Sequence, residues 1–306
     1  MAPQAFPGLS PAARQQMLAL GPVWREDINA HRQAVVDIYS PLHAAREQQD
    51  VIVTRDIAYG EHERQRLDLY LPRGKSVGPR PVVMFVHGGA FLRGSMNPNP
   101  HIYGNVPSYF ARHGMVGINV EYRLAPQAPY PAGSVDVAAA VAWVRAHAHE
   151  FGGDAQRVIL VGHSAGGAHV CSYVADPALQ EMRWQGHGVS ALVLISARLR
   201  ADVHADNPNA AGVRAYWGED ATQYERRSPV SHADHIDIPL MIAVAEHENP
   251  YLDVYAAELF WRVAQARGRA PRLVQVPHHN HTSIVAHLGS EEDMLGQQIR
   301  DFIGPP

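Results

Sequence analysis

Short apolar runs alternate with longer segments of helical periodicity along most of this chain. Continuous apolar runs are typical of strands that are buried on both faces. The alternation therefore predicts an α/β fold, with a mostly parallel sheet and helices on both of its faces. The predicted strands are residues 51–58, 66–71, 81–87, 115–122, 157–162, 191–196, 240–245 and 272–276. The predicted helices are residues 12–20, 23–39, 134–150, 165–175, 252–266 and 291–303.

Composition and charge narrow the class of protein without identifying it. With 46% hydrophobic and 18% charged residues, the chain has the make-up of an ordinary globular enzyme. A net charge of −4 gives no electrostatic reason to expect nucleic acid or a membrane surface as a partner. Residues 1–22 lack the pattern of a signal peptide, so we expect none. Cys171 is the only cysteine, which excludes an intrachain disulfide, favours a cytoplasmic location and predicts a packed, inert thiol.

The apolar run at 158–161 leads into a G-x-S-x-G motif whose serine is Ser164. A buried strand before the motif and a helix after it are the context of a nucleophile elbow, in which the serine lies at the apex of a sharp turn. Gly162 and Gly166 fit this turn because it leaves no room for Cβ atoms beside the serine. The backbone N–H of Ala165 would lie at a helix N-terminus, where it can stabilise an oxyanion.

A serine becomes a nucleophile when a histidine takes its proton and a carboxylate orients that histidine. In a fold with a nucleophile elbow, the acid and the histidine follow the serine on loops after later strands. Two loops of this chain supply such residues. The candidates are Glu246, Glu248 and Asp253 after strand 240–245, and His278, His279 and His281 after strand 272–276.

An acyl-transfer site also needs hydrogen-bond donors for the oxyanion, and residues 87–91 follow an apolar strand where such donors belong. Gly88 and Gly89 are the candidate donors, because glycine lets the backbone turn its N–H groups towards a bound carbonyl. We expect His87 to brace this loop by hydrogen bonds. We expect Arg123 and Asp136 to form a structural polar network below the site.

Several spaced motifs occur in a fixed order: H-G-G-A-F at 87–91, E-Y-R-L-A-P at 121–126 with P-Y-P-A at 129–132, F-G-G-D at 151–154 and G-H-S-A-G-G at 162–167. Together they resemble the bacterial hormone-sensitive-lipase-type esterases of the α/β-hydrolase superfamily, from about residue 51 to the C-terminus. The resemblance implies an eight-stranded sheet, a cap and hydrolysis of carboxylic esters without a cofactor. It also implies Glu248 as the acid and His281 as the base, with His279 as the alternative base. We expect His247, which stands between the two glutamates, to lie on the surface.

Two positions depart from that family. His163 precedes the nucleophile where the family usually has aspartate, and Glu248 stands where aspartate is commoner. These features and the segment N-H-T-S-I-V at 280–285 also resemble the arylformamidase and feruloyl-esterase-like branches of the superfamily. The motifs therefore predict the mechanism but leave the substrate class open.

Two polar regions lie outside the strand–helix alternation. Residues 1–50 form a predicted N-terminal helical cap segment, and the catalytic domain spans 51–306 with a cap insertion at about 198–238. Connections as long as this insertion are usually functional or form a subdomain. We expect an apolar substrate pocket with aromatic walls that suits small or medium acyl chains. Its predicted lining residues are Phe91, Tyr103, His163, Tyr216 and Trp217.

The sequence thus favours a serine carboxylesterase that acts through an acyl-enzyme on a small-molecule ester. One alternative is an arylformamidase or amidase with the same triad, and another is a non-catalytic ligand-binding receptor on a hydrolase-like fold. The chain has 19 histidines, with a cluster at 278–281 that is a candidate metal site. Neither H-x-x-x-H nor H-E-x-x-H occurs, so we predict no metal. That no cofactor takes part is what the resemblance implies. A homodimer stays open as an alternative to a monomer.

Overall fold

The strands form a single sheet in the computed structural model, which describes residues 5–46, 51–74, 78–183 and 188–306. The strands are β1 (Val51–Ala58), β2 (Arg66–Pro72), β3 (Arg80–Val86), β4 (Val116–Val120), β5 (Gly153–His163), β6 (Ala191–Ile195), β7 (Leu240–His247) and β8 (Arg272–Asn280). Within the described residues, the strand order is β1-β2-β4-β3-β5-β6-β7-β8. β2 is antiparallel to β1 and β4, and the other pairs are parallel. The predicted mostly parallel, eight-stranded sheet is confirmed.

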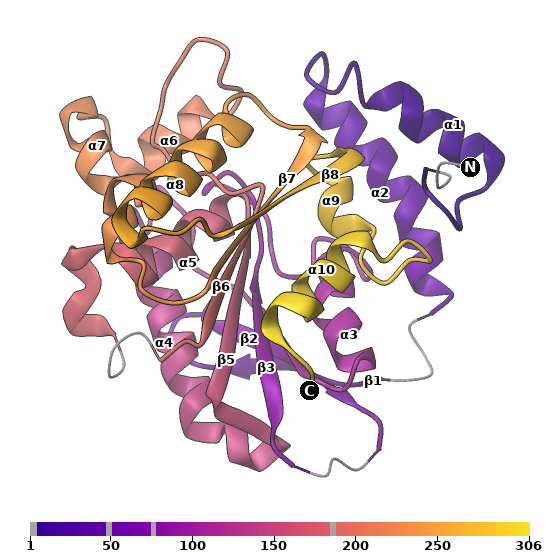
Figure 1. Cartoon of the computed structure of the whole chain (residues 1–306), viewed down its shortest axis with the longest axis horizontal. Helices are drawn as coiled ribbons and strands as arrows, with labels where there is room; N and C mark the ends of the chain where they lie inside the picture. The colour runs from indigo at the N-terminus through magenta and orange to yellow at the C-terminus, as the bar shows by residue number, and fades with distance from the viewer. Residues whose placement is uncertain (1–4, 47–50, 75–77, 184–187) are drawn as a thin grey trace.

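Helices cover both faces of this sheet (Figure 1). They are α1 (Pro11–Leu20), α2 (Ile28–Ala44), α3 (Asn105–Arg112), α4 (Ala132–His147), α5 (Ala165–Ala175), α6 (Ala210–Trp217), α7 (Tyr224–Arg227), α8 (Leu252–Arg267), α9 (Ser283–Ala286) and α10 (Met294–Ile303). α4, α5 and α8 pack on one face, and α3, α9 and α10 pack on the other. Among the described residues, no helix has the length and apolar character needed to span a membrane.

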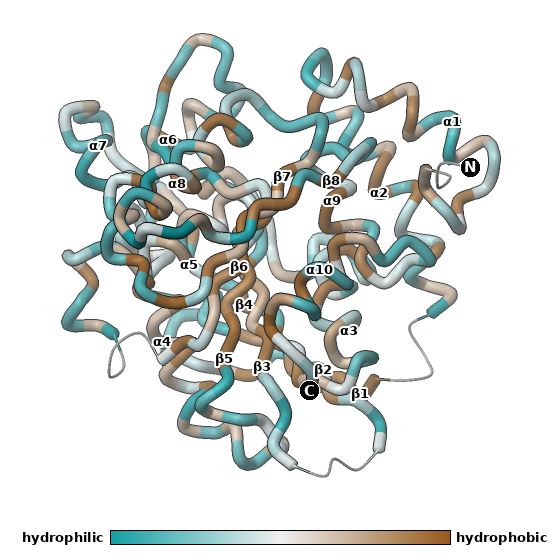
Figure 2. The backbone as a smooth tube through the Cα atoms, in the orientation of Figure 1, coloured by the Kyte–Doolittle hydropathy of each residue, from teal (hydrophilic) through white to brown (hydrophobic). Residues whose placement is uncertain are grey.

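Alternate side chains of each central strand enter the two halves of the core. In β3, Val82, Met84 and Val86 face α4, α5 and α8, whereas Val83 and Phe85 face α3 and α10. All five are fully buried, and each contributes about 1.5–3 kcal/mol of hydrophobic stabilisation. Figure 2 shows the same pattern, because the central strands are hydrophobic and the peripheral loops are mostly hydrophilic.

The two polar regions lie near the carboxyl ends of the parallel strands. α1 and α2 lie beside α9, and the segment from 198 to 238 holds α6 and α7 on the other side of that edge (Figure 1). A cluster that includes Trp24, Val35, Tyr39 and Ala286 attaches the N-terminal helices to the sheet domain. Residues 1–4 and 47–50 of the predicted cap segment lie outside the described residues.

The predicted bounds of the second helix, 23–39, are wrong. α2 begins at Ile28, because the Asp27 side chain caps it by accepting a hydrogen bond from the Ala30 N–H at 3.0 Å. Its last turns, up to Ala44, pack against α9, and that tertiary contact carries the helix past the point where its sequence pattern fades. β8 likewise runs on to Asn280 rather than ending at 276, because its last residues still pair with β7.

Several histidines are buried in this fold and held neutral. Burial lowers the pKa of His169, His279 and His287 to about 3 and that of His43 to about 4. An unfolded histidine has a pKa near ~6.5, so the unfolded chain binds protons that the folded chain excludes once the pH falls below that value. The free energy of unfolding should therefore fall as the pH drops from about 6.5 towards 3.

We predict that the melting temperature falls steadily between pH 7 and pH 4.5 at constant ionic strength. Each buried histidine removes up to about 1.4 kcal/mol of stability per pH unit in this window. His169→Gln should make the decline shallower, whereas His149→Gln, at an exposed position, should leave its slope unchanged. A melting temperature that stayed level from pH 7 to pH 5 would contradict the prediction.

Candidate active site

Ser164 lies at the sharp turn between β5 and α5. Its backbone angles are φ 54° and ψ −117°, in a region that side-chain-bearing residues rarely adopt. A Cβ on Gly162 would lie 2.5 Å from Val170 Cγ2, and one on Gly166 would lie 2.2 Å from the Val86 carbonyl oxygen. Both positions therefore require glycine, and the close packing of strand, turn and helix holds the serine in its strained conformation.

The structure brings Ser164, His281 and Glu248 together. His281 Nε2 lies 3.1 Å from Ser164 Oγ, and His281 Nδ1 lies 2.8 Å from Glu248 Oε2. The three residues come from the ends of β5, β8 and β7, which reach the same edge of the sheet. This is the geometry of a nucleophile, a base and an orienting acid.

The Glu248 carboxylate is buried and fully hydrogen-bonded. Besides His281, it accepts hydrogen bonds from Ser196 Oγ, from the Ala245 N–H at 3.0 Å and from the Asn249 N–H at 3.2 Å. Burial raises the pKa of this carboxyl, but the charge of His281 and the hydrogen bonds from His281, Ser196 and Ala245 together hold the pKa below its ordinary value. Glu248 is therefore ionised at neutral pH.

Sequence reasoning missed Ser196. This residue follows β6, the strand between β5 and β7, and has a positive φ of 47°. Its hydroxyl donates to the Glu248 carboxylate. A serine directly after the strand beside the acid-bearing strand is a signal that could have identified it, once the strand order is known.

The other candidate acids and bases do not join this arrangement. Glu246 is exposed and accepts a hydrogen bond from the His278 N–H at 2.5 Å. His279 is buried on the far side of the same strand end, with Nδ1 3.0 Å from Ser283 Oγ. Asp253 lies in the first turn of α8. Among these candidates, Glu248 and His281 alone form a hydrogen-bonded chain that reaches Ser164, through His281.

Gly88 and Gly89 lie against the serine as candidate oxyanion donors. A Cβ on Gly88 would be 3.0 Å from Ser164 Cβ, and one on Gly89 (φ 153°) would be 1.7 Å from the Arg93 carbonyl oxygen. The N–H of Ala165 opens α5 directly after Ser164, where the helix dipole favours negative charge. Gly88 and Gly89 line the same cavity as Ser164, and their role as oxyanion donors with Ala165 stays a prediction.

A buried network holds the loop of these glycines. His87 Nδ1 lies 2.7 Å from the Gly88 carbonyl oxygen, and Nε2 lies 2.9 Å from Glu121 Oε1. Tyr122 Oη donates to the His87 carbonyl oxygen at 3.0 Å, and Arg64 pairs with the Glu121 carboxylate. His87 thus braces the loop as expected, and Glu121 is the partner that the sequence did not reveal.

Two further expectations concern residues away from the serine. Arg123 Nη2 pairs with the Asp136 carboxylate at 2.7 Å, and Gln65 donates to the same carboxylate at 2.8 Å. Cys171 is fully buried, and burial raises its pKa to about 12. Within the described part of the chain, no three or more His, Cys, Asp or Glu side chains are placed to hold a metal ion.

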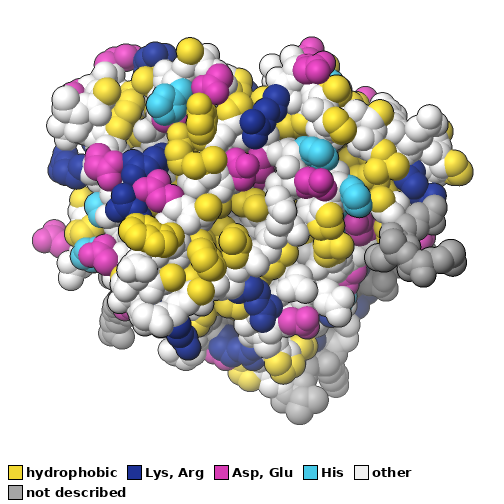
Figure 3. All heavy atoms as spheres, turned by 45° about the horizontal axis from the view of Figure 1, so that its top comes forward, with side chains coloured by type: hydrophobic (Ala, Val, Ile, Leu, Met, Phe, Trp, Pro, Cys, Tyr) yellow, Lys and Arg dark blue, Asp and Glu magenta, His cyan; other side chains and the backbone are white. Residues whose placement is uncertain are grey.

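A cavity of about 530 Å³ opens above Ser164 and His281. Figure 3 shows the outline of the molecule notched on this side, between the lobe of the N-terminal helices and the lobe of α6 and α8. Tyr103 and His163 line the cavity, as expected. His163 Nε2 lies 2.9 Å from the His281 carbonyl oxygen and Nδ1 lies 3.3 Å from Tyr103 Oη, so this histidine supports the loop of the base. Burial lowers the pKa of His163, which keeps its ring neutral.

The prediction that Phe91, Tyr216 and Trp217 form the cavity walls is wrong. They are 2%, 3% and 0% exposed, and they pack on one another and on the first turns of α5. Phe91 stacks on Tyr216 with ring centroids 4.7 Å apart. These aromatic side chains pack into the core beneath α6, because that burial stabilises the insertion more than a position facing the cavity would. α2 and the loop after β3 supply the walls instead, with Ile28, Arg32, Val36 and Arg93 among the lining residues.

The chain is similar to several proteins that are named as esterases. Residues 67–181 match the protein family described as BD-FAE. The chain is 35% identical over 166 residues to esterase LipC of Mycobacterium tuberculosis (strain ATCC 25618 / H37Rv), which covers 53% of this chain and 40% of LipC. It is 30% identical over 187 residues to carboxylesterase NlhH of the same strain, covering 55% of this chain and 56% of NlhH. It shares 21% identity and a TM-score of 0.71 with the hyperthermophilic esterase from the archaeon Pyrobaculum calidifontis, covering 96% of this chain and 97% of that chain.

The eight-stranded sheet and the sharp strand–turn–helix around Ser164 form an α/β-hydrolase fold. In sequence, the chain is similar to proteins named as an esterase and a carboxylesterase. The aligned regions span about half or less of the two mycobacterial relatives' own lengths. The similarity to the archaeal esterase bears on the fold alone.

We predict that a fluorophosphonate probe labels Ser164 and that Glu248→Gln slows this labelling by about 10²–10⁴-fold. An amide in place of the carboxylate no longer selects the tautomer in which His281 can accept the serine proton. Glu246→Gln serves as the matched control and should label within about twofold of the wild-type rate. The measurement is the rate of covalent labelling followed by mass spectrometry. Equal or reversed effects of the two substitutions would show that Glu248 is not the acid.

Proposed function

We propose that this chain is a serine carboxylesterase that hydrolyses small to medium carboxylic esters through an acyl-enzyme. One observation carries the proposal: the hydrogen-bonded chain from Glu248 through His281 to Ser164 lies at the base of a cavity. The names of the relatives, esterase LipC and carboxylesterase NlhH, support the same reaction class. The cavity volume of about 530 Å³ lies within the usual range for sites that bind small molecules.

In the proposed acylation step, His281 Nε2 takes the proton from Ser164 Oγ as this oxygen attacks the ester carbonyl. His281 then carries a positive charge, which the ionised Glu248 carboxylate stabilises across their 2.8 Å contact. The N–H groups of Gly88, Gly89 and Ala165 stabilise the oxyanion of the tetrahedral intermediate. When the intermediate collapses, the C–O bond of the ester breaks and His281 gives its proton to the leaving alcohol.

Deacylation repeats these steps with water in place of the serine. His281 takes a proton from water, the hydroxide attacks the acyl carbonyl, and Ser164 leaves with the proton that His281 returns. The hydrogen bond of Tyr103 to His163, and of His163 to the His281 backbone, keeps the base in place through both steps. A cytoplasmic location remains a prediction that rests on the single cysteine.

We expect Ser164→Ala to abolish hydrolysis of p-nitrophenyl esters, with kcat lowered by about 10⁴–10⁶-fold. The melting temperature should change little, because the serine hydroxyl contacts His281 and contributes nothing to the packing of the core. Initial rates on esters of graded acyl length, from acetate to decanoate, test the activity and its chain-length range together. Ser231→Ala, at a serine outside the cavity, is the matched control.

Residual activity of Ser164→Ala above about a tenth of wild type would refute the assignment of the nucleophile. Hydrolysis of a formanilide or anilide faster than of the matched phenyl ester would move the protein to the amidase class. Activity that fell with EDTA and returned with zinc would show a metal-dependent reaction. The proposal expects ester preference and no effect of EDTA.

A further inference from the structure

Two arginines line the cavity above Ser164, and they come from different parts of the chain. Arg32 lies on α2 in the N-terminal segment, and Arg93 lies in the loop after β3 that also holds Gly88 and Gly89. Burial lowers the pKa of Arg93, and the charge of Arg32 lowers it further. Both side chains are exposed to solvent and line the same cavity.

The cavity supplies no carboxylate to balance this charge. No Asp or Glu side chain lines it, and neither Arg32 nor Arg93 forms an ion pair with any residue that the structure describes. Arg93 Nη2 has only a long contact, 3.5 Å, with the neutral Asn209 Oδ1. Figure 3 shows acidic and basic side chains scattered over this side of the molecule. The surface around the cavity therefore carries carboxylates, whereas the cavity lining does not.

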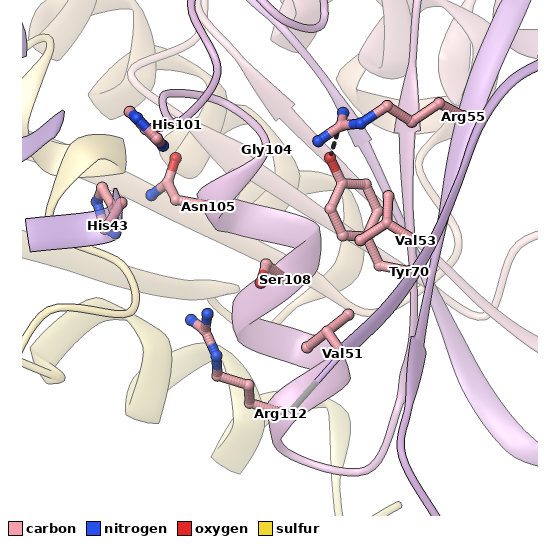
Figure 4. A pocket seen from close by; sticks show the side chains of 10 residues that line it. All are labelled: His43, Val51, Val53, Arg55, Tyr70, His101, Gly104, Asn105, Ser108 and Arg112. Atoms are coloured by element: carbon pink, nitrogen blue, oxygen red, sulfur yellow. Dashed lines mark hydrogen bonds between the residues drawn. The ribbon is translucent and has the colours of Figure 1, made fainter. Parts of the chain in front are cut away.

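At another cavity of this protein, an arginine does have a carboxylate partner. A smaller cavity of about 190 Å³ between β1 and α3 also has arginines on its wall, Arg55 and Arg112 (Figure 4). Arg55 Nη1 pairs with the Asp68 carboxylate at 2.8 Å and lies 3.4 Å from Tyr70 Oη. The smaller cavity thus has a carboxylate beside Arg55, whereas no carboxylate of the described residues lines the cavity above Ser164.

A cavity lined by one sign of charge attracts ligands of the opposite sign, and a guanidinium binds a carboxylate through two parallel N–H donors. The polar lining residues also include Asn29, a neutral amide that can donate to the same group. The net charge of the whole chain is −4, so the positive cavity does not follow from composition. Each of these features favours an anionic substrate.

We propose that the preferred esters carry a free carboxylate, which Arg32 and Arg93 bind while Ser164 attacks the ester carbonyl. This inference rests on the proposed carboxylesterase function and specifies its substrate class. The ester C–O bond breaks, water supplies the hydroxyl of the acid product and the proton of the alcohol, and the bound carboxylate is unchanged. The carboxylate can lie on the acyl side or on the alcohol side, and the experiment separates the two.

Two matched pairs of substrates test the proposal. On the acyl side, mono-p-nitrophenyl adipate is compared with p-nitrophenyl hexanoate, and on the alcohol side, para-acetoxybenzoate is compared with para-acetoxybenzamide. The readout is the ratio of kcat/KM for the anionic to the neutral member, each corrected for its rate with hydroxide. We expect a ratio of about ten or more in at least one pair, and that pair identifies the side.

The arginine variants show whether these residues cause the preference. Arg32→Gln and Arg93→Gln should each lower the ratio by about three- to tenfold, and the double variant should bring it to about one. Arg32→Lys and Arg93→Lys should keep part of it, because they keep the charge. Arg269→Gln removes the same charge in the loop before β8, outside the cavity, and should leave the ratio unchanged. Raising the salt from about 0.02 M to about 0.5 M should lower the wild-type ratio through screening.

A wild-type ratio of one or less in both pairs would overturn the proposal, as would a preference that survives in the double variant. Melting temperatures of all variants identify any loss of activity that comes from unfolding. Hydrolysis of the neutral esters without a preference refutes only the carboxylate inference. Failure of the folded wild type to hydrolyse any of the four esters refutes the carboxylesterase proposal and this inference with it.

Discussion

The buried hydrogen bond between Glu248 and His281 is the contact on which the rest of this site depends. Burying an unpaired carboxylate would cost several kcal/mol, so the ionised Glu248 is tolerated only because its oxygens accept hydrogen bonds from four residues. The carboxylate holds the ring of His281 by its Nδ1, so that Nε2 points at Ser164. The donors come from the ends of β6, β7 and β8, so the register of the sheet sets the geometry of the triad.

The N-terminal helices depend on the same loop. Trp24 Nε1 donates to Asn249 Oδ1 at 2.8 Å, and Arg25 Nε donates to the Glu248 backbone oxygen at 2.9 Å. Gly21 packs directly against the His247 ring, where a Cβ would lie 2.5 Å from it. The segment that carries Arg32 over the cavity is therefore fastened to the residues that hold the acid. Movement of this segment would disturb the substrate cavity and the acid loop together.

Much of the fold and of the reacting centre could be predicted from sequence, because the signals are local. The elbow around Ser164 and the glycines at 88 and 89 stand in short motifs whose spacing is fixed by the turn they form. His281 is 117 positions from Ser164, and Glu248 is 33 positions from His281. Selecting these two residues therefore needed the order of the strands along the chain and the family resemblance. Ser196 could not be predicted, because its role depends on which strands are neighbours in the sheet. The sequence alone does not give that order.

The cavity walls were mispredicted for a related physical reason. Hydrophobic pattern shows that α6 has an apolar face, but not whether that face turns to the cavity or to the core. Phe91, Tyr216 and Trp217 gain more by packing against one another and against α5 than by meeting solvent above Ser164, and they are buried accordingly. Arg32 and Arg93 read as ordinary solvated residues in the sequence, and only the folded chain places both over one cavity. The nucleophile turn and the glycine loop of this site are thus encoded in contiguous motifs, whereas the lining of its cavity depends on how α2 and the loop after β3 come together.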